Sequence, residues 1–377
     1  MATAARCLRS QLLNRSLLPR PATRWQSSIS NIETELKARK IQPIFDDLTP
    51  QSSYRLDVTL ADLLPARNPP AVLPSTTSPN VLPIPHHLIY FEPTKRASEM
   101  LADGTNPDQS PGEPFIRRMW AGGRVLYNQA NPFLLDASRG VCAEFIRSVT
   151  TKGKPGQEKI FVSIERRQAK ATEDEMKQLA SAQSGGQAKE DLEHRVRQRL
   201  WRDSDQDFGP CSIIETRNIV FMRSRSQEEA KLEAEKAKDK ILTPQHKPDW
   251  TYTITPDPKL LFRFSALTFN AHAIHLDPRY CQEVEGHRDL LFHGPLSYVF
   301  MISMLQHELR KNTNEVIKQV EYRNLAPLYC NEPVTFCGTK TGDHKHEIWT
   351  QTPEGGLAVK GSAVTEVGNI DRSQLDT

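Results

Sequence analysis

The clearest hydrophobic pattern lies in the last third of the chain. Residues 290–309 are apolar on nearly every side, which is typical of a helix buried in a core. Strand-like runs follow it, at 317–322, 333–339, 345–351 and 357–367. Short glycine-containing turns typical of hairpins separate the last three runs. A long buried helix followed by an antiparallel meander predicts a sheet that wraps around a central helix.

Weaker patterns predict the elements that precede this region. Alternating residues predict strands at 141–150, 159–166 and 213–223, with a hairpin turn between the first two. Short apolar runs predict two more strands, at 252–254 and 260–264. Residues 31–50 suggest a short helix or linker, and the proline-rich stretch 51–115 is expected to be mostly irregular, with the chain wrapping over the surface.

Charge divides the chain into two units. Residues 227–240 are dense in Glu and Lys with few apolar positions, and a proline-rich joint follows them at 243–248. We therefore expect an N-terminal unit over 31–242 and a C-terminal unit over 243–377. The first unit carries a charged helical insertion at about 171–203, split by Gly185 and Gly186, and a linker at about 226–242.

Composition limits the class of protein. The net charge of +3 is too small to indicate a nucleic-acid partner, and no apolar run is long enough to predict a membrane span. The six cysteines form no C-x-x-C pair, so free thiols are expected rather than a disulfide framework or a zinc site. Residues 1–30 contain five arginines and no acidic residue, which predicts a mitochondrial transit peptide and a matrix location.

Residues 263–296 carry the candidate chemistry. Asp277-Pro278 is a strong helix start, and Gly286 is expected to end that helix. His275 is therefore expected on a loop that leaves a strand, partly exposed. Asn270, His272 and His275 lie within six residues. A histidine can take or give a proton near neutral pH, and a neighbouring amide can orient water or the imidazole.

The start of the buried helix completes this constellation. Gly294 allows close approach to the backbone, and the first N–H groups of a helix stabilise a developing oxyanion. His293 and Pro295 flank this glycine and are expected to contact substrate. A base, an acid and an oxyanion site are what the β-elimination of water requires. A His-x-x-His pair could also bind metal, but no third ligand with suitable spacing is evident.

These residues resemble the hydratase-2, or MaoC-like, motif, which runs Asp-x-Asn-Pro-x-His and is followed by a helix start and a later His-Gly. His275-Leu276-Asp277-Pro278 and His293-Gly294 match this motif. The wider sequence, including Phe264–His272, Val284–Gly286 and Arg117–Gly123, is similar to the hydroxyacyl-thioester dehydratases type 2 of fungal mitochondria. The resemblance covers most of residues 80–370.

The resemblance implies an α+β double hot-dog fold, with two antiparallel sheets that each wrap around a long central helix. It implies reversible dehydration of (R)-3-hydroxyacyl thioesters to trans-2-enoyl thioesters in mitochondrial type II fatty acid synthesis, without cofactor or metal. Acyl carrier protein or CoA would carry the acyl group. Two hot-dog units in one chain imply either a monomeric pseudo-dimer or a homodimer.

The sequence departs from the general motif at one position. Asn270 stands where most members have a catalytic aspartate, and His272 stands at the motif's asparagine. An asparagine cannot act as a general base, so His275 is expected to transfer protons while Asn270 orients water. His272 is the alternative for the second role. Two other functions stay open: a hydratase of short branched or dicarboxylic acyl-CoA, of the mesaconyl-CoA type, and a non-catalytic subunit that binds acyl thioesters.

The N-terminal unit lacks the histidine motif. In the family such a degenerate unit widens the acyl tunnel. Arg117, Arg118 and Trp120 are expected either to line that tunnel or to pack the interface, with packing favoured for Met119 and Trp120.

Overall fold

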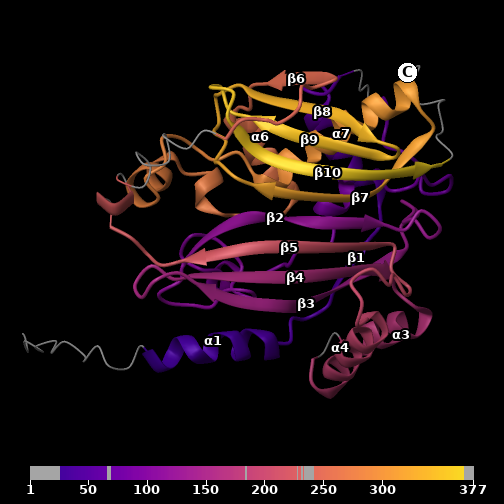
Figure 1. The fold of residues 1–377 in the computed structure, drawn as a ribbon. Coiled ribbons are helices and arrows are strands. Elements are labelled where there is room, and N and C mark those ends of the chain that lie inside the picture. Colours follow the sequence, from indigo (N-terminus) through magenta and orange to yellow (C-terminus); the bar gives the residue numbers. More distant parts are fainter. Residues whose placement is uncertain are drawn as a thin grey trace, which may run out of the picture.

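A ten-stranded antiparallel sheet organises the molecule (Figure 1). The computed structural model describes residues 26–65, 69–182, 185–226, 228–230, 232 and 242–368. The expected transit peptide, apart from residues 26–30, and most of the expected linker lie outside these residues. The strands are β1 (Ile44–Asp47), β2 (Arg117–Tyr127), β3 (Arg139–Lys152), β4 (Lys159–Lys170), β5 (Ile213–Met222), β6 (Trp250–Ile254), β7 (Glu315–Asn324), β8 (Val334–Gly342), β9 (Lys345–Gln351) and β10 (Leu357–Val367).

The two halves of the sheet repeat one strand order. The N-terminal half runs β2-β5-β4-β3-β1, and the C-terminal half runs β7-β10-β9-β8-β6. Antiparallel pairing of β2 with β7, for example Val125 opposite Val320, joins the halves into one sheet. Figure 1 shows the N-terminal strands in violet to salmon on one side of this seam and most C-terminal strands in orange to yellow on the other.

The helices cover both faces of the sheet. The α-helices are α1 (Gln26–Ala38), α2 (Pro50–Leu60), α3 (Glu173–Ala182), α4 (Gln187–Leu200), α6 (Pro258–Leu267) and α7 (Gly294–Asn312). Short turns of other helix types are η2 (His86–Ile89), η3 (Ala97–Glu99), η4 (Ala273–His275) and η5 (Tyr280–Val284). Helix α7 is buried as predicted, since Val299, Phe300 and Met301 are all inaccessible to solvent. Within the described residues, no helix combines the length and apolarity that crossing a membrane requires.

Most predicted elements are confirmed, including the helical pair α3 and α4 in the insertion, but one predicted strand is wrong. Residues 260–264 were predicted as a strand and instead lie within helix α6. Asp257 caps this helix by accepting the N–H of Leu260, and Pro258 occupies its first turn. The short apolar run is ambiguous by periodicity alone, and its buried face packs into the core through Leu260, Leu261 and Phe264.

In the described part of the N-terminal half there is no long central helix of the kind predicted for each unit. Between β1 and β2 the described chain forms α2, of 11 residues, and the short turns η2 and η3. Helix α2 packs against α6, its topological counterpart. Proline recurs throughout 61–115 and removes the backbone donors that a long helix needs. The prediction of an irregular stretch at 51–115 therefore holds, except for α2.

Charged side chains occupy the inner face of the N-terminal half. Arg166 is fully buried and ion-pairs with Glu144 at 2.9 Å, Glu215 at 3.1 Å and Glu92 at 3.5 Å. Arg217 contacts Glu215 at 2.8 Å on the same face. We call these five residues the buried ion network. The buried ion network lies on the same face of the sheet as Cys142, which belongs to the hydrophobic core around α7. In the C-terminal half, the equivalent face of the sheet packs directly on α7.

Candidate active site

The segment after α6 forms the candidate site. The chain turns through η4, and a short helix then begins at Pro278. Asp277 caps this helix because its side chain accepts the N–H groups of Arg279 and Tyr280 at 2.9 and 3.2 Å. Gly286, with φ of +67°, follows its end. The predicted helix start and stop are therefore both confirmed.

His275 occupies the centre of the site. It follows a helix rather than the expected strand, and it is buried rather than partly exposed, with 8% of its surface accessible. Its Nδ1 lies 2.8 Å from the carbonyl oxygen of Leu291. A carbonyl only accepts, so Nδ1 carries the hydrogen and donates it. The Nε2 atom is therefore the unprotonated nitrogen, and its lone pair can accept a proton.

The imidazole of His293 packs against that of His275. The two imidazoles stack with ring centroids 3.6 Å apart and planes 19° from parallel. His293 is fully buried, and its Nε2 lies 2.9 Å from the Oγ of Ser265 on α6. It is also the residue that precedes the first turn of α7. The side chain of His293 therefore connects His275 to α6 and to the start of α7.

His272 brings a residue of the other half into the site. Its ring meets that of His275 edge to face, with centroids 5.7 Å apart. Its Nε2 lies 3.5 Å from a carboxylate oxygen of Asp103, which is itself buried. Asp103 also accepts the backbone N–H of Ala273 through its carbonyl, at 2.9 Å. The sequence prediction missed Asp103, because it lies in the irregular stretch and the Asp-Gly turn there is the only local signal.

Burial keeps all three imidazoles neutral at neutral pH. It lowers the pKa of His275 to about 4, although the hydrogen bond to Leu291 acts in the opposite direction. Burial, reinforced by the nearby His275 and Arg118, holds the pKa of His272 well below the ordinary value. Burial, and then the other two histidines, lowers the pKa of His293 in the same way. At neutral pH the three imidazoles are therefore in the unprotonated form, which can accept a proton.

Asn270 and Gly294 have identifiable local contacts. The side-chain oxygen of Asn270 accepts the backbone N–H of His272 at 3.0 Å, so it fixes the turn that presents the histidines.

At Gly294 an added Cβ would come within 2.9 Å of Asn324 and 3.4 Å of Trp120. Glycine is therefore needed here to let β2 and β7 approach the start of α7. Pro295 follows within the first turn and has no N–H, so Gly294 and Leu296 supply the donors without intrahelical acceptors.

The candidate residues on β2 make two kinds of contact, ion pairs and packing against the hydrophobic core. Arg117 pairs with Glu285 at 2.8 Å and so fastens β2 to the helix that follows His275. Trp120 packs on the core and donates from its Nε1 to the hydroxyl of Tyr322 at 2.9 Å. The packing expected for Met119 is wrong, because this side chain is 45% exposed.

Arg118 lies close enough to His272 for its charge to lower the pKa of that histidine. It donates to the backbone carbonyl of Asn106 at 3.0 Å, and its guanidinium lies over the ring of Phe221. Burial lowers the pKa of Arg118 to about 10, while the charge of Asp103 acts in the opposite direction. A cation therefore stands beside His272.

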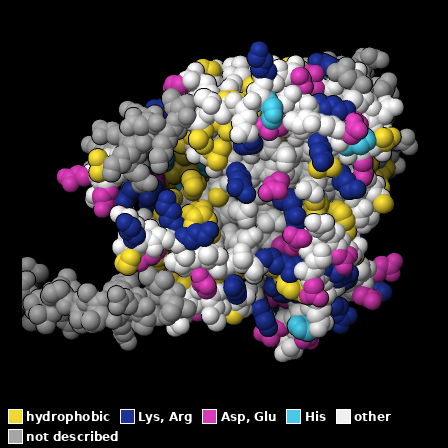
Figure 2. All heavy atoms as spheres, viewed as in Figure 1, with side chains coloured by type: hydrophobic (Ala, Val, Ile, Leu, Met, Phe, Trp, Pro, Cys, Tyr) yellow, Lys and Arg dark blue, Asp and Glu magenta, His cyan; other side chains and the backbone are white. Residues whose placement is uncertain are grey.

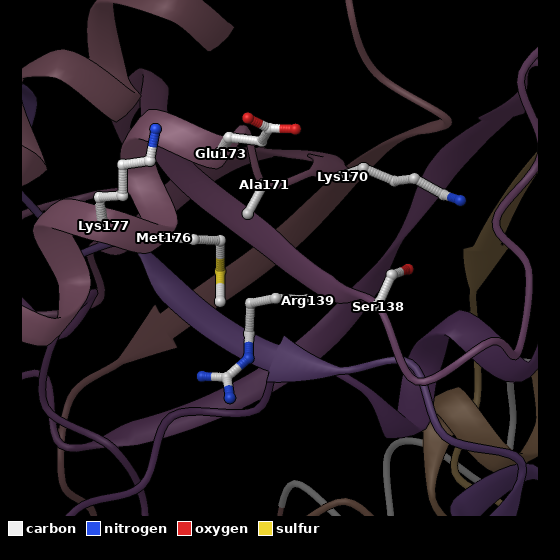
Figure 3. A pocket seen from close by; sticks show the side chains of 7 residues that line it. All are labelled: Ser138, Arg139, Lys170, Ala171, Glu173, Met176 and Lys177. Carbon is white, nitrogen blue, oxygen red and sulfur yellow. The ribbon is translucent and has the colours of Figure 1, made fainter.

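A separate hollow of about 440 Å³ lies where β3 and β4 meet α3 (Figure 3). Arg139, Lys170 and Met176 are among its lining residues. Its basic groups are engaged elsewhere, Arg139 with Asp47 and Lys170 with Asp136. The hollow shares no residue with the histidine cluster.

On the face shown in Figure 2, basic and acidic side chains are interspersed, in keeping with the small net charge. Across the described ranges, no grouping of His, Cys, Asp or Glu is suited to a metal ion.

Comparison with known proteins places this site in a family. The family model of hydroxyacyl-thioester dehydratase type 2 matches residues 85–184 and 177–330. Mesaconyl-C(4)-CoA hydratase of Chloroflexus aurantiacus is 31% identical over 319 residues, which are 83% of this chain and 93% of that protein. The mitochondrial hydroxyacyl-thioester dehydratase type 2 of Schizosaccharomyces pombe is 26% identical over 265 residues, 68% of this chain and 78% of its own.

A solved structure supports the fold. The MaoC-like dehydratase from Phytophthora capsici superposes with a TM-score of 0.53 at 12% identity, covering 89% of this chain and 99% of that one. The predicted double hot-dog architecture is therefore confirmed, with two differences. The two sheets are fused through β2 and β7, and the described part of the N-terminal half has no long central helix. From the matched family model and the relative of 31% identity we conclude that the chain belongs to the hydroxyacyl-thioester dehydratase type 2 family.

Proposed function

We propose that this protein catalyses the reversible dehydration of (R)-3-hydroxyacyl thioesters to trans-2-enoyl thioesters, with His275 as the proton-transfer group. The observation that carries this proposal is the bond from His275 Nδ1 to the carbonyl of Leu291. It fixes the tautomer and leaves Nε2 as a base of set direction. Burial lowers the pKa of His275 to about 4, so the base is unprotonated throughout the neutral range.

The reaction then needs one proton shuttle. His275 Nε2 takes the proton from C2 of the acyl group, and the electron pair of that C–H bond moves toward the thioester carbonyl. The N–H groups of Gly294 and Leu296 at the start of α7 stabilise the resulting enolate oxygen. The C3–O bond breaks, the protonated His275 returns its proton to the departing hydroxyl, and water leaves. Hydration runs through the same steps in reverse.

The direct test is turnover by the full-length protein and by His275→Ala. Water addition is followed as the loss of enoyl-thioester ultraviolet absorbance. We expect a fall in rate of roughly 100- to 10 000-fold, the usual contribution of a general acid–base. His287→Ala is the matched control, because burial also lowers the pKa of His287 to about 4 and this residue lies in the same segment. Equal rates for wild type and His275→Ala would remove the assignment.

A second substrate class has support from one relative. The Chloroflexus protein is named for mesaconyl-C(4)-CoA, which carries a carboxylate besides its thioester. Arg118, beside His272, is the cation that such a carboxylate would meet. A substrate panel of long, short and dicarboxylic thioesters separates the two. If Arg118→Gln raises KM only for the dicarboxylic substrate, the second class is favoured.

The remaining assignments follow from the same proposal. The carrier is acyl carrier protein or CoA, and the yeast relatives, named as mitochondrial, support a mitochondrial matrix location. We retain the unit boundary at 242/243 and a monomeric pseudo-dimer or a homodimer as proposals. Binding of enoyl thioesters by the wild type with no turnover would instead favour a non-catalytic binding subunit.

A further inference from the structure

Asp103 stands where the histidine cluster needs a carboxylate. It belongs to the irregular stretch of the N-terminal half, yet its backbone carbonyl accepts the N–H of Ala273, inside the histidine segment. The two loops are pressed together at this point, because a Cβ on Gly104 would lie 2.1 Å from the carbonyl oxygen of Ala271. Gly104, with φ of +80°, makes this approach possible.

The carboxylate is held in a fixed direction. One oxygen, Oδ1, accepts both the backbone N–H and the hydroxyl of Thr105, at 3.0 and 2.6 Å. The other oxygen, Oδ2, faces His272 Nε2 at 3.5 Å. Asp103 is 9% exposed and His272 is 7% exposed, so solvent screens the pair little.

The acids closest in sequence to the histidines are engaged elsewhere. Asp277 caps the helix that follows His275, and Glu285 pairs with Arg117. Asp289 accepts the backbone N–H of Leu290 at 2.7 Å and the side-chain amide of Asn331 at 3.1 Å. Asn270, which stands at the position of the family's usual aspartate, is an amide whose oxygen accepts a backbone N–H. The carboxylate that faces the cluster therefore comes from the other half of the chain.

We propose that Asp103 is the positioning residue for His272, and that Asp103 and His272 together take the part that an aspartate within the motif would otherwise play. With its Nε2–H directed at Asp103, His272 presents Nδ1 as a hydrogen-bond acceptor. That acceptor orients the hydroxyl group of the substrate in dehydration, or the attacking water in hydration, while His275 moves the proton. This inference rests on the proposed function.

The test is Asp103→Asn in the full-length chain. The amide nitrogen of the variant would donate to His272 Nε2 and move the ring hydrogen to Nδ1, so that the acceptor becomes a donor. We expect kcat for enoyl-thioester hydration to fall about 100-fold with little change in KM. Asp108→Asn is the matched control, since that acid lies on the same stretch and pairs with Lys95, both side chains being partly exposed.

A double variant and a spectroscopic readout distinguish positioning from folding. Asp103→Asn should cost nothing further in a His272→Gln background, and nitrogen NMR of the imidazole should show the hydrogen on Nε2 in the wild type and on Nδ1 in the variant. An unchanged kcat, additive losses or an unchanged tautomer would overturn the inference. An inactive wild type would instead count against the proposed function, because the tautomer of His272 is measured without turnover.

Discussion

The two halves of this chain share a strand order but fill their sheets in different ways. The C-terminal half wraps β6–β10 around α7, whose middle residues are apolar and fully buried. The N-terminal half has no described helix of that length between β1 and β2, and it presents a buried ion network on the same face of its sheet.

The halves also share an isolated β-bridge, which precedes α7 in the C-terminal half and η2 in the N-terminal half. In the C-terminal half, Leu291 forms an isolated bridge with Tyr329 shortly before His293 and α7. In the N-terminal half, Val81 forms the same kind of bridge shortly before η2, a single turn. We infer that η2 is what remains of a central helix. Helix α7 is complete, and its N-terminal donors follow His293, which stacks on His275.

The largest predicted effect on stability concerns the buried ion network. Arg166→Met would leave Glu92, Glu144 and Glu215 with much less positive charge in a buried setting. We expect the free energy of unfolding to fall by about 3–5 kcal/mol in denaturant titration. Arg139→Met is the control, because its pair with Asp47 is exposed, and it should cost less than about 1 kcal/mol. Equal losses would mean that the network does not hold this half together.

A smaller effect is expected at the seam between the halves. Gly294→Ala would place a Cβ within 2.9 Å of Asn324, whose side chain donates to the carbonyl of Trp120 at 2.8 Å. We expect a loss of about 1–3 kcal/mol, as in other overpacked sites, measured by thermal unfolding. Gly342→Ala is the control, since nothing lies closer than 4.0 Å to its Cβ. A fully stable Gly294→Ala would show that the two halves tolerate separation here.

Periodicity predicted the regular part of the fold and failed at particular residues. The strands and α7 follow from local alternation and from an unbroken apolar helix. Positions such as Glu144 and Arg166 have the charged side chains of a solvent-facing strand, yet they are buried and paired. Alternation identifies which residues share a face, but it does not show whether the chain covers that face.

The candidate site was also only partly predictable. Asn270, His272, His275 and His293 were found because they lie close together in one segment or next to a helix start. Asp103 was missed because its contact with His272 depends on how two distant loops pack together. The partial exposure predicted for His275 was wrong for a different reason: helix α6 and the turn η4, rather than a strand and a loop, present this side chain.

The most direct test of the central claim is the pH dependence of kcat/KM for enoyl-thioester hydration. Burial lowers the pKa of His275 to about 4, below the ordinary value, so the catalytic base stays unprotonated as the pH falls through the range where most histidines gain a proton. The account predicts a constant kcat/KM from neutral pH down to about pH 5 and a decline only toward about pH 4. A decline centred near pH 6.5, the value of an unperturbed imidazole, would contradict it.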